Sequence, residues 1–243
     1  MTQNKANIKY WSEEANLKWQ ERQFNQPNRR TVAFEKFLSQ NVDMDNQEIL
    51  DIACGGGGVT SYIAQLHRSS HFTGIDINVE LFRLYQNQDD NVRLEYGDIY
   101  NLNDEYINKY NGIICFQTLS WLPEYKRPLE QMCKLNAEWM AFSSLFYDGK
   151  INYTISLENY ERPTHNSKYS QVYYNIYSVP MIAELLAEYG YTKVHYYPYE
   201  IDIDLNKPEH KDLGFYTVKT DEGVRLGFNT CLYQPEGFIF ASR

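Results

Sequence analysis

The stretch Asp51-Ile52-Ala53-Cys54-Gly55-Gly56-Gly57-Gly58 decides how this chain folds. It joins a short apolar run to a segment of helical period that begins near Val59. Glycines at such a junction let the backbone turn sharply, and they let a ligand approach main-chain atoms that a Cβ would obstruct. The unpaired N–H groups at the start of the following helix suit a carboxylate or a phosphate. The stretch therefore predicts a strand, a ligand-binding turn and a helix.

Apolar runs and helical segments alternate along the chain from Glu48 onward, which is the pattern of βαβ units with a parallel sheet. Successive units with right-handed crossovers predict an α/β fold with a Rossmann-like, doubly wound sheet, whose ligand lies at the carboxyl ends of the strands. The predicted strands are 48–52, 72–75, 92–96, 112–116, 139–146, 192–199 and 238–241, and the predicted helices are 59–67, 79–86, 129–135 and 179–189.

Two regions depart from this repetition. Residues 151–157, with the sequence INYTISL, alternate in polarity and predict a strand in an insertion after the fifth strand. Residues 215–231 predict a hairpin that turns at Asp221-Glu222-Gly223. We expect both to add β elements on the substrate side. The predicted division of the chain is a helical N-terminal cap at 1–45 and one domain at 46–243, with insertions at about 147–177 and 201–235.

Composition and charge disfavour several classes of protein. The net charge is -9 with no basic run, so a nucleic-acid substrate is unfavourable. No apolar stretch approaches the roughly 18 residues that cross a bilayer and the N-terminus is polar, so we expect no membrane contact and a cytoplasmic location. The four cysteines form no Cys-x-x-Cys pair, and His67 and His71 straddle a predicted helix end, so we predict reduced thiols and no metal site. The oligomeric state stays open.

Polar residues end four successive predicted strands: Asp51, Asp76, Asp98 and Gln117. A carboxylate at the place of Asp76 can accept hydrogen bonds from both hydroxyls of a ribose. The glycine run and this carboxylate also fit a dinucleotide site, so an NAD-dependent oxidoreductase is an alternative. Such an enzyme needs a proton donor such as a Tyr-x-x-x-Lys pair, and the stretch Tyr106-Ile107-Asn108-Lys109 lacks that spacing.

The order Asp-Ile-Ala-Cys-Gly-x-Gly, Gly-Ile-Asp, Gly-Asp-Ile and then a polar run after Ile-Ile-Cys-Phe resembles the class I S-adenosylmethionine-dependent methyltransferase family. The resemblance covers residues 48–146. It implies a seven-stranded, mostly parallel sheet with an antiparallel last strand, and S-adenosylmethionine as the cofactor. Ala53 departs from the more frequent first glycine by one methyl group. The implied contacts are Asp51, Ala53, Gly55 and Gly57 to the methionine portion, Asp76 to the ribose, Ile77, Asp98 and Ile99 to the adenine, and Gln117 below the cofactor.

A narrower likeness rests on Tyr10-Trp11, Tyr147-Asp148-Gly149 and Thr217-Val218-Lys219, which resemble bacterial methyltransferases encoded with surface-polysaccharide genes. It implies a small-molecule acceptor, such as a sugar or nucleotide-sugar hydroxyl. A base that takes the proton of a hydroxyl acceptor is then useful. The candidates for this catalytic base are His165 and Asp148, each of which also fits a solvated loop or turn.

Three further interpretations stay open. Tyr10 and Trp11 fit either a lid over the cofactor or packing against the sheet. Arg29 and Arg30 fit either contact with an anionic group or exposed charges at a helix end. The whole chain also fits a methyltransferase-like protein that has lost catalysis and serves as a binding or scaffolding subunit.

Overall fold

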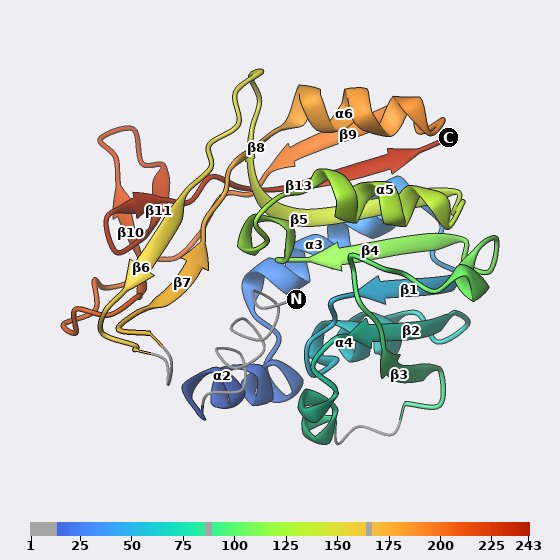
Figure 1. The fold of residues 1–243 in the computed structure, drawn as a ribbon, viewed down its shortest axis with the longest axis horizontal. Helices are drawn as coiled ribbons and strands as arrows, with labels where there is room; N and C mark the ends of the chain where they lie inside the picture. Colours follow the sequence, from blue (N-terminus) through green and yellow to red (C-terminus); the bar gives the residue numbers. More distant parts are fainter. Residues whose placement is uncertain (1–13, 86–88, 164–166) are drawn as a thin grey trace.

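A central sheet organises the computed structural model, which describes residues 14–85, 89–163 and 167–243 (Figure 1). The strands of this sheet are β1 (Glu48–Ile52), β2 (His71–Asp76), β3 (Val92–Tyr96), β4 (Gly112–Phe116), β5 (Trp139–Tyr147), β8 (Tyr177–Ser178), β9 (Lys193–Pro198) and β13 (Glu236–Ser242). The order is β3-β2-β1-β4-β5-β13-β9, with β8 paired to the end of β5. The pairs from β3 to β5 are parallel, and β13 is antiparallel to both β5 and β9. The predicted Rossmann-like sheet with an antiparallel last strand is confirmed.

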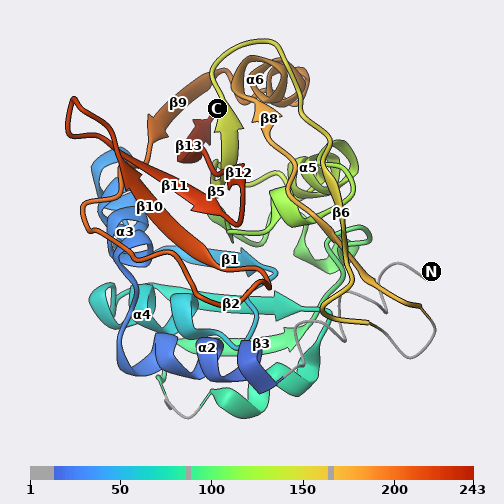
Figure 2. The same cartoon turned by 90° about the vertical axis from the view of Figure 1, so that its left-hand side faces the viewer.

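Smaller β elements lie beyond the carboxyl ends of the parallel strands. They are β6 (Ser156–Asn159), β7 (Ser170–Tyr173), β10 (Phe215–Lys219), β11 (Arg225–Asn229) and β12 (Leu232–Tyr233). In Figure 1 the arrowheads of β1, β2 and β4 point toward these elements, and Figure 2 shows β10 and β11 in front of the central sheet from that side. The inserted strands therefore face the edge of the sheet where α/β proteins bind their ligands.

Helices cover both faces of the sheet. The α-helices are α2 (Glu14–Asn25), α3 (Arg29–Asn41), α4 (Gly58–Leu66), α5 (Lys126–Lys134) and α6 (Val179–Glu188). Short 3-10 helices are η1 (Val79–Leu84), η2 (Asp104–Tyr106) and η3 (Leu119–Trp121). Asn28 caps α3 by accepting a hydrogen bond from the Thr31 amide at 2.8 Å, and Ser178 caps α6 through the Met181 amide. α2 and α3 fall in the predicted helical cap, whose limits as a separate unit stay a prediction.

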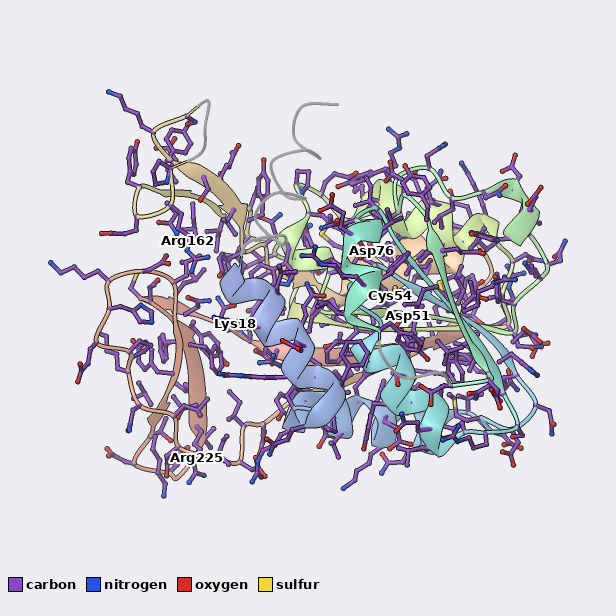
Figure 3. All side chains as sticks on the ribbon, turned by 90° about the horizontal axis from the view of Figure 1, so that it is seen from below. Lys18, Asp51, Cys54, Asp76, Arg162 and Arg225 are labelled. Atoms are coloured by element: carbon purple, nitrogen blue, oxygen red, sulfur yellow. The ribbon has the colours of Figure 1, made fainter. Side chains whose placement is uncertain are left out.

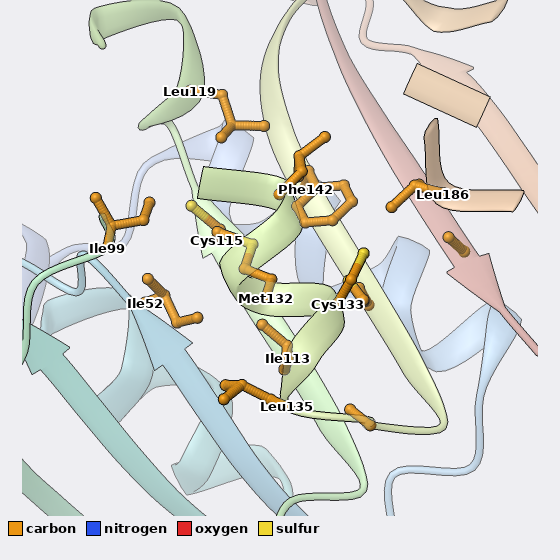
Figure 4. Packing of buried hydrophobic residues seen from close by; sticks show 14 of the residues in the cluster. Ile52, Ile99, Ile113, Cys115, Leu119, Met132, Cys133, Leu135, Phe142 and Leu186 are labelled. Carbon is orange, nitrogen blue, oxygen red and sulfur yellow. The ribbon is translucent and has the colours of Figure 1, made fainter. Parts of the chain in front are cut away.

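Successive residues of the buried strands supply the core on both faces of the sheet, because side chains alternate along a strand. Ile114 packs with Phe34 of α3 on one face, while Ile113 packs with Met132 of α5 on the other. Figure 4 shows the second of these clusters, in which Met132 and Leu135 lie over Ile113. The apolar run in β4 is therefore buried on both faces, as the sequence predicts.

The helix predicted over residues 79–86 is wrong in type. The chain forms the short 3-10 helix η1 there, and residues 86–88 lie outside the described residues. Asp76 accepts a hydrogen bond from the Asn78 amide at 2.8 Å, which fixes the chain in a turn just before this segment. A segment this short makes too few bonds to offset the cost of starting an α-helix, so it tightens into the 3-10 form.

The strand predicted over residues 151–157 is also wrong for most of its length. Only an isolated bridge joins Tyr153 to Ile176, and β6 begins at Ser156. The amide of Ile155 donates to the side-chain oxygen of Asn175 at 2.8 Å instead of to a backbone carbonyl. The Asn175 side chain thus replaces a backbone partner that a β-ladder would need. The alternation of polarity in the sequence does not reveal this side-chain bond.

The predicted hairpin over residues 215–231 is confirmed. β10 and β11 pair antiparallel, with Lys219 opposite Arg225. Between them Gly223 has a φ of 88°, and its amide donates to the Thr220 carbonyl at 2.9 Å. A residue with a Cβ is strained at such a φ, which explains the glycine in this turn.

Gly112 gives a direct test of the packing around the Trp139 side chain on the sheet. A Cβ added at Gly112 would lie 2.0 Å from Cζ2 of Trp139, whose indole is buried and stacked on Phe240. We expect Gly112→Ala to destabilise the protein by about 1–3 kcal/mol through overpacking. For a chain of this length that is roughly 2–12 °C in the melting temperature, measured by circular dichroism.

Gly149→Ala is the matched control, because the three atoms nearest to the added Cβ there all belong to the exposed side chain of Tyr147. Equal melting temperatures for the two variants would contradict the packing described around Trp139.

Candidate active site

A cavity of about 660 Å³ opens at the carboxyl edge of the parallel strands. The opposite wall comes from the segments around β7, β10 and β11, which include Tyr174, Phe215 and Asn229. The predicted cofactor-contact residues that line the cavity are Ala53, Gly55, Asp76, Ile77, Asp98, Ile99 and Gln117. The fold thus brings together the ends of β1 to β4 in one cavity, and the size suits a small molecule.

The turn after β1 adopts backbone angles that favour glycine. Gly55 and Gly57 have φ values of 58° and 84°, and Ala53 reaches 62° despite its methyl group. A Cβ added at Gly55 would lie 2.9 Å from the side-chain oxygen of Gln20 on α2. Gly57 is the N-cap of α4 and does not line the cavity. Its place in the structure supports a role in the turn, and not the predicted contact to the methionine portion.

Asp51 lies behind this turn and does not line the cavity. Its Oδ2 accepts a hydrogen bond from the Thr60 hydroxyl at 2.5 Å, while its Oδ1 has no hydrogen-bond partner among the described residues. Burial raises the pKa of Asp51 to about 7, although the bond from Thr60 opposes the rise. A buried carboxylate with an unpaired oxygen beside the turn favours a positive charge in the neighbouring cavity.

Asp76 ties the turn to the end of β2. Its two carboxylate oxygens accept hydrogen bonds from the amides of Gly55 at 2.9 Å and Asn78 at 2.8 Å. Burial raises the pKa of Asp76, and these amide bonds oppose the rise. The Ile77 amide also donates to this carboxylate, which has about four lone-pair sites in all, so a site remains for a ligand hydroxyl. Figure 3 shows Asp76 grouped with Asp51 and Cys54 beside α4.

The ends of β3 and β4 complete this half of the cavity. Asp98 accepts a hydrogen bond from the Tyr100 amide at 2.9 Å, and Ile99 lies beside it. Gln117 has a φ of 53°, and its side-chain amide donates to the Ser143 hydroxyl at 2.9 Å. Backbone in this sparsely populated region is held by its surroundings and is common at functional sites. Gln117 is therefore fixed rigidly against β5.

Of the four predicted residues that remain, one, Asp148, is among the described residues. Asp148 is exposed in the turn after β5 and is not part of the lining, so the structure gives no support to Asp148 as a base. His165, Tyr10 and Trp11 lie outside the described residues, and their roles stay predictions.

The structure adds contacts of polar residues that the sequence patterns did not predict. Gln20 of α2 accepts a hydrogen bond from the Gly56 amide at 2.8 Å, and Gln23 lines the same side of the cavity. Arg30 binds both carboxylate oxygens of Glu236 through its Nε and Nη2 atoms. Burial raises the pKa of Glu236, and the Arg30 guanidinium opposes that rise. Each contact joins residues far apart in the chain, so periodicity gives no signal for them.

Comparison with known proteins establishes the family. Residues 43–197 match the methyltransferase domain family, so this chain belongs to that family. It is 24% identical over 144 residues to (S)-tetrahydroprotoberberine N-methyltransferase of Eschscholzia californica, covering 57% of this chain and 39% of that protein. It is 25% identical over 112 residues to a phthiotriol/phenolphthiotriol dimycocerosates methyltransferase of Mycobacterium leprae, covering 45% of this chain and 41% of that protein. The chain thus spans about two fifths of the length of these relatives.

Solved structures share the fold at low sequence identity. Magnesium protoporphyrin IX methyltransferase from Synechocystis with bound S-adenosylmethionine has a TM-score of 0.52 and 14% identity, covering 88% of this chain and 78% of that one. Human N-acetylserotonin methyltransferase has a TM-score of 0.54 and 13% identity, covering 96% and 57%. The predicted resemblance to class I methyltransferases is therefore confirmed. Within residues 14–85, 89–163 and 167–243, no helix has the length and apolarity to cross a membrane.

The raised pKa of Asp51 predicts how stability depends on pH. Between about pH 4 and 7 the folded protein holds a proton on Asp51 that the unfolded chain releases, since the ordinary pKa is 3.8. This contribution to the free energy of unfolding therefore falls as the pH rises through that window. Asp51→Asn removes the titration, so its melting temperature relative to wild type should rise between pH 5 and pH 8.

Asp221→Asn, in the exposed hairpin turn, is the control and should show a flat difference over the same range. Melting curves at half-unit steps of pH check both. A flat difference for Asp51→Asn as well would mean that Asp51 stays ionised throughout.

Proposed function

We propose that this chain transfers the methyl group of S-adenosylmethionine to a small-molecule acceptor. The observation that carries the proposal is the convergence of Gly55, Asp76 and Asp98 on one cavity at the reversal point of the sheet. The family and the shared fold confirm the predicted cofactor, because neighbours with this fold are crystallised with S-adenosylmethionine or S-adenosylhomocysteine. The residues present fit that cofactor, because Asp76 lines the cavity with a carboxylate that can accept hydrogen bonds from ribose hydroxyls.

The roles of individual residues follow from their places in the cavity. Asp76 would accept hydrogen bonds from the ribose hydroxyls, and Asp98 with Ile99 would hold the adenine. The glycine turn and Gln20 would hold the methionine portion. Both line the cavity, and the Gly56 amide of the turn donates a hydrogen bond to Gln20. S-adenosylmethionine carries its methyl group on a sulfonium, which an acceptor lone pair displaces in line.

Holding donor and acceptor in line supplies much of the catalysis, about 7–11 kcal/mol in favourable cases. The segments around β7, β10 and β11 close the cavity opposite the cofactor residues and help to exclude water. The described lining contains no histidine, and its carboxylates Asp76, Asp98 and Glu236 already accept hydrogen bonds within the chain, so no free base is evident in it. The predicted bases His165 and Asp148 are tested by Asp148→Asn and His165→Gln, which should lower kcat if either residue takes the proton.

Experiments can distinguish the acceptor class and the alternative functions from the proposed function. The sugar or nucleotide-sugar hydroxyl predicted from the narrower likeness is one class of small-molecule acceptor, and screening acceptors for release of S-adenosylhomocysteine distinguishes it from others. A protein that has lost catalysis would bind the cofactor but methylate no acceptor. The oxidoreductase alternative loses its support, because the family match includes the glycine turn and the strand ends on which it relied.

Asp76→Ala tests the cofactor site. We expect it to weaken binding of S-adenosylmethionine at least about tenfold, or about 1.4 kcal/mol, because it removes hydrogen bonds to two hydroxyls. Isothermal titration calorimetry with S-adenosylmethionine, S-adenosylhomocysteine and NAD measures the effect.

Glu184→Ala is a control. Glu184 lies on α6 in an exposed ion pair with Lys150, and the variant should bind S-adenosylmethionine as wild type does. Asp76→Asn keeps an acceptor oxygen for the Gly55 amide and separates loss of charge from loss of the turn. Unchanged affinity in Asp76→Ala would overturn the assigned site, and no heat with either sulfur ligand would overturn the proposed function.

A further inference from the structure

The half of the cavity that faces away from Asp76 is built differently from the cofactor half. We name it the acceptor chamber and define it by the lining residues Trp121, Val172, Tyr174, Ile201, Ile203 and Phe215. Phe116 and Gln117, at the end of β4, line the same cavity. We take the chamber as the side of the cavity from which the acceptor approaches the methyl group of a bound cofactor, an assignment that rests on the proposed function.

Residues 201–205 contribute apolar side chains to this chamber in a regular pattern. Along residues 201–205, Ile201, Ile203 and Leu205 are half-buried and line the cavity, while Asp202 and Asp204 between them are exposed. The alternation gives the segment one apolar face, which lines the chamber. Hydrogen bonds in both directions between Leu205 and Thr217 hold it beside β10. The apolar wall is thus a fixed part of the fold.

Every arginine in the lining is already paired with a carboxylate of this chain. Arg30 binds Glu236, Arg29 binds Asp202, and Arg162 binds Asp212. A phosphate or carboxylate ligand would have to compete with these internal partners, and the pair of Arg30 with Glu236 is largely buried. The chamber therefore presents no uncompensated positive charge from its arginines to an anionic acceptor.

One buried donor gives the chamber a polar end. Gln234 lines the cavity and is 4% exposed, and its Nε2 has no hydrogen-bond partner among the described residues. A buried donor without a partner costs about 1–3 kcal/mol, so an oxygen of a ligand beside Gln234 stabilises it. Pockets of this kind fix the orientation of an apolar ligand through a few polar groups.

We propose that the acceptor is an uncharged, mainly apolar small molecule with a ring system, which lies against the apolar wall and directs one oxygen toward Gln234. Trp121 and Tyr174 meet edge to face at 4.3 Å and offer aromatic surface to such a ring. A nucleotide sugar fits poorly, because its diphosphate would face arginines that already have partners. The chemistry of the chamber thus narrows the substrate class beyond a small molecule.

Binding of matched probes tests this inference. The probes are 2-naphthol, naphthalene, methyl glucoside and UDP-glucose, each titrated by calorimetry into protein saturated with S-adenosylhomocysteine. We expect 2-naphthol to bind at least about tenfold more tightly than either sugar, because it buries apolar area without displacing an ion pair. Tighter binding of a sugar, or no binding of 2-naphthol, would overturn the proposal.

Variants locate the probe. Ile203→Asp should weaken 2-naphthol binding by at least about tenfold, since it places a charge in the apolar wall. Val218→Asp, at a position on β10 that is 45% exposed, should change it less than about twofold. Gln234→Leu should weaken 2-naphthol about fivefold and leave naphthalene unchanged, because only 2-naphthol has an oxygen to accept the bond. Equal effects on the two aromatic probes would remove Gln234 from the proposal.

The outcome is distinguishable from failure of the proposed function. Binding of S-adenosylhomocysteine is measured first for each variant, together with its melting curve, so a folding defect is recognised directly. Protein that binds no S-adenosylhomocysteine would overturn the proposed function. The same 2-naphthol titration on cofactor-free protein still decides whether the chamber takes an apolar ring.

Discussion

The path of the backbone between β1 and α4 is the constraint on which the site depends. Within a few residues the chain must leave a buried strand, turn and begin a helix, and it does so through left-handed φ values at Ala53, Gly55 and Gly57. A left-handed residue with a Cβ costs roughly 1–2 kcal/mol, so the glycines spare most of that cost. The same turn directs the Gly55 amide to Asp76 and the Gly56 amide to Gln20. The turn after β1 is thus bonded to the end of β2 and to α2 at the carboxyl edge of the sheet.

The sequence predicted the cofactor half well for a physical reason. Strands buried on both faces are continuous apolar runs, and the residues that end them lie on one edge of a parallel sheet. Asp76, Asp98 and Gln117 could therefore be placed from the order of the runs alone. The segments that failed, at 79–86 and 151–157, are those where Asp76 or Asn175 side chains bond to nearby amides. Hydrophobic periodicity contains no information about such local competition.

The acceptor half could not be predicted because long-range pairs form it. Arg30 and Glu236 are 206 residues apart, and Arg162 reaches Asp212 across two insertions. The first pair fastens α3 to β13 of the central sheet, and the second joins the two insertions to each other, at points that no motif marks. The lining combines carboxylates and the glycine turn at the strand ends with aliphatic and aromatic side chains and internally paired arginines from the other segments. One fold thereby prepares two unlike environments in one cavity.

The position of β13 in the sheet has a consequence for synthesis of the protein. β13 lies between β5 and β9, yet it follows both in the chain. A growing chain that has not yet reached Glu236 holds the facing edges of β5 and β9 without their partner, and it also lacks the carboxylate that pairs with Arg30. Unpaired strand edges are templates for association with other chains. The nascent polypeptide therefore exposes two unpaired strand edges until β13 inserts, and association with other chains is most favourable at that stage.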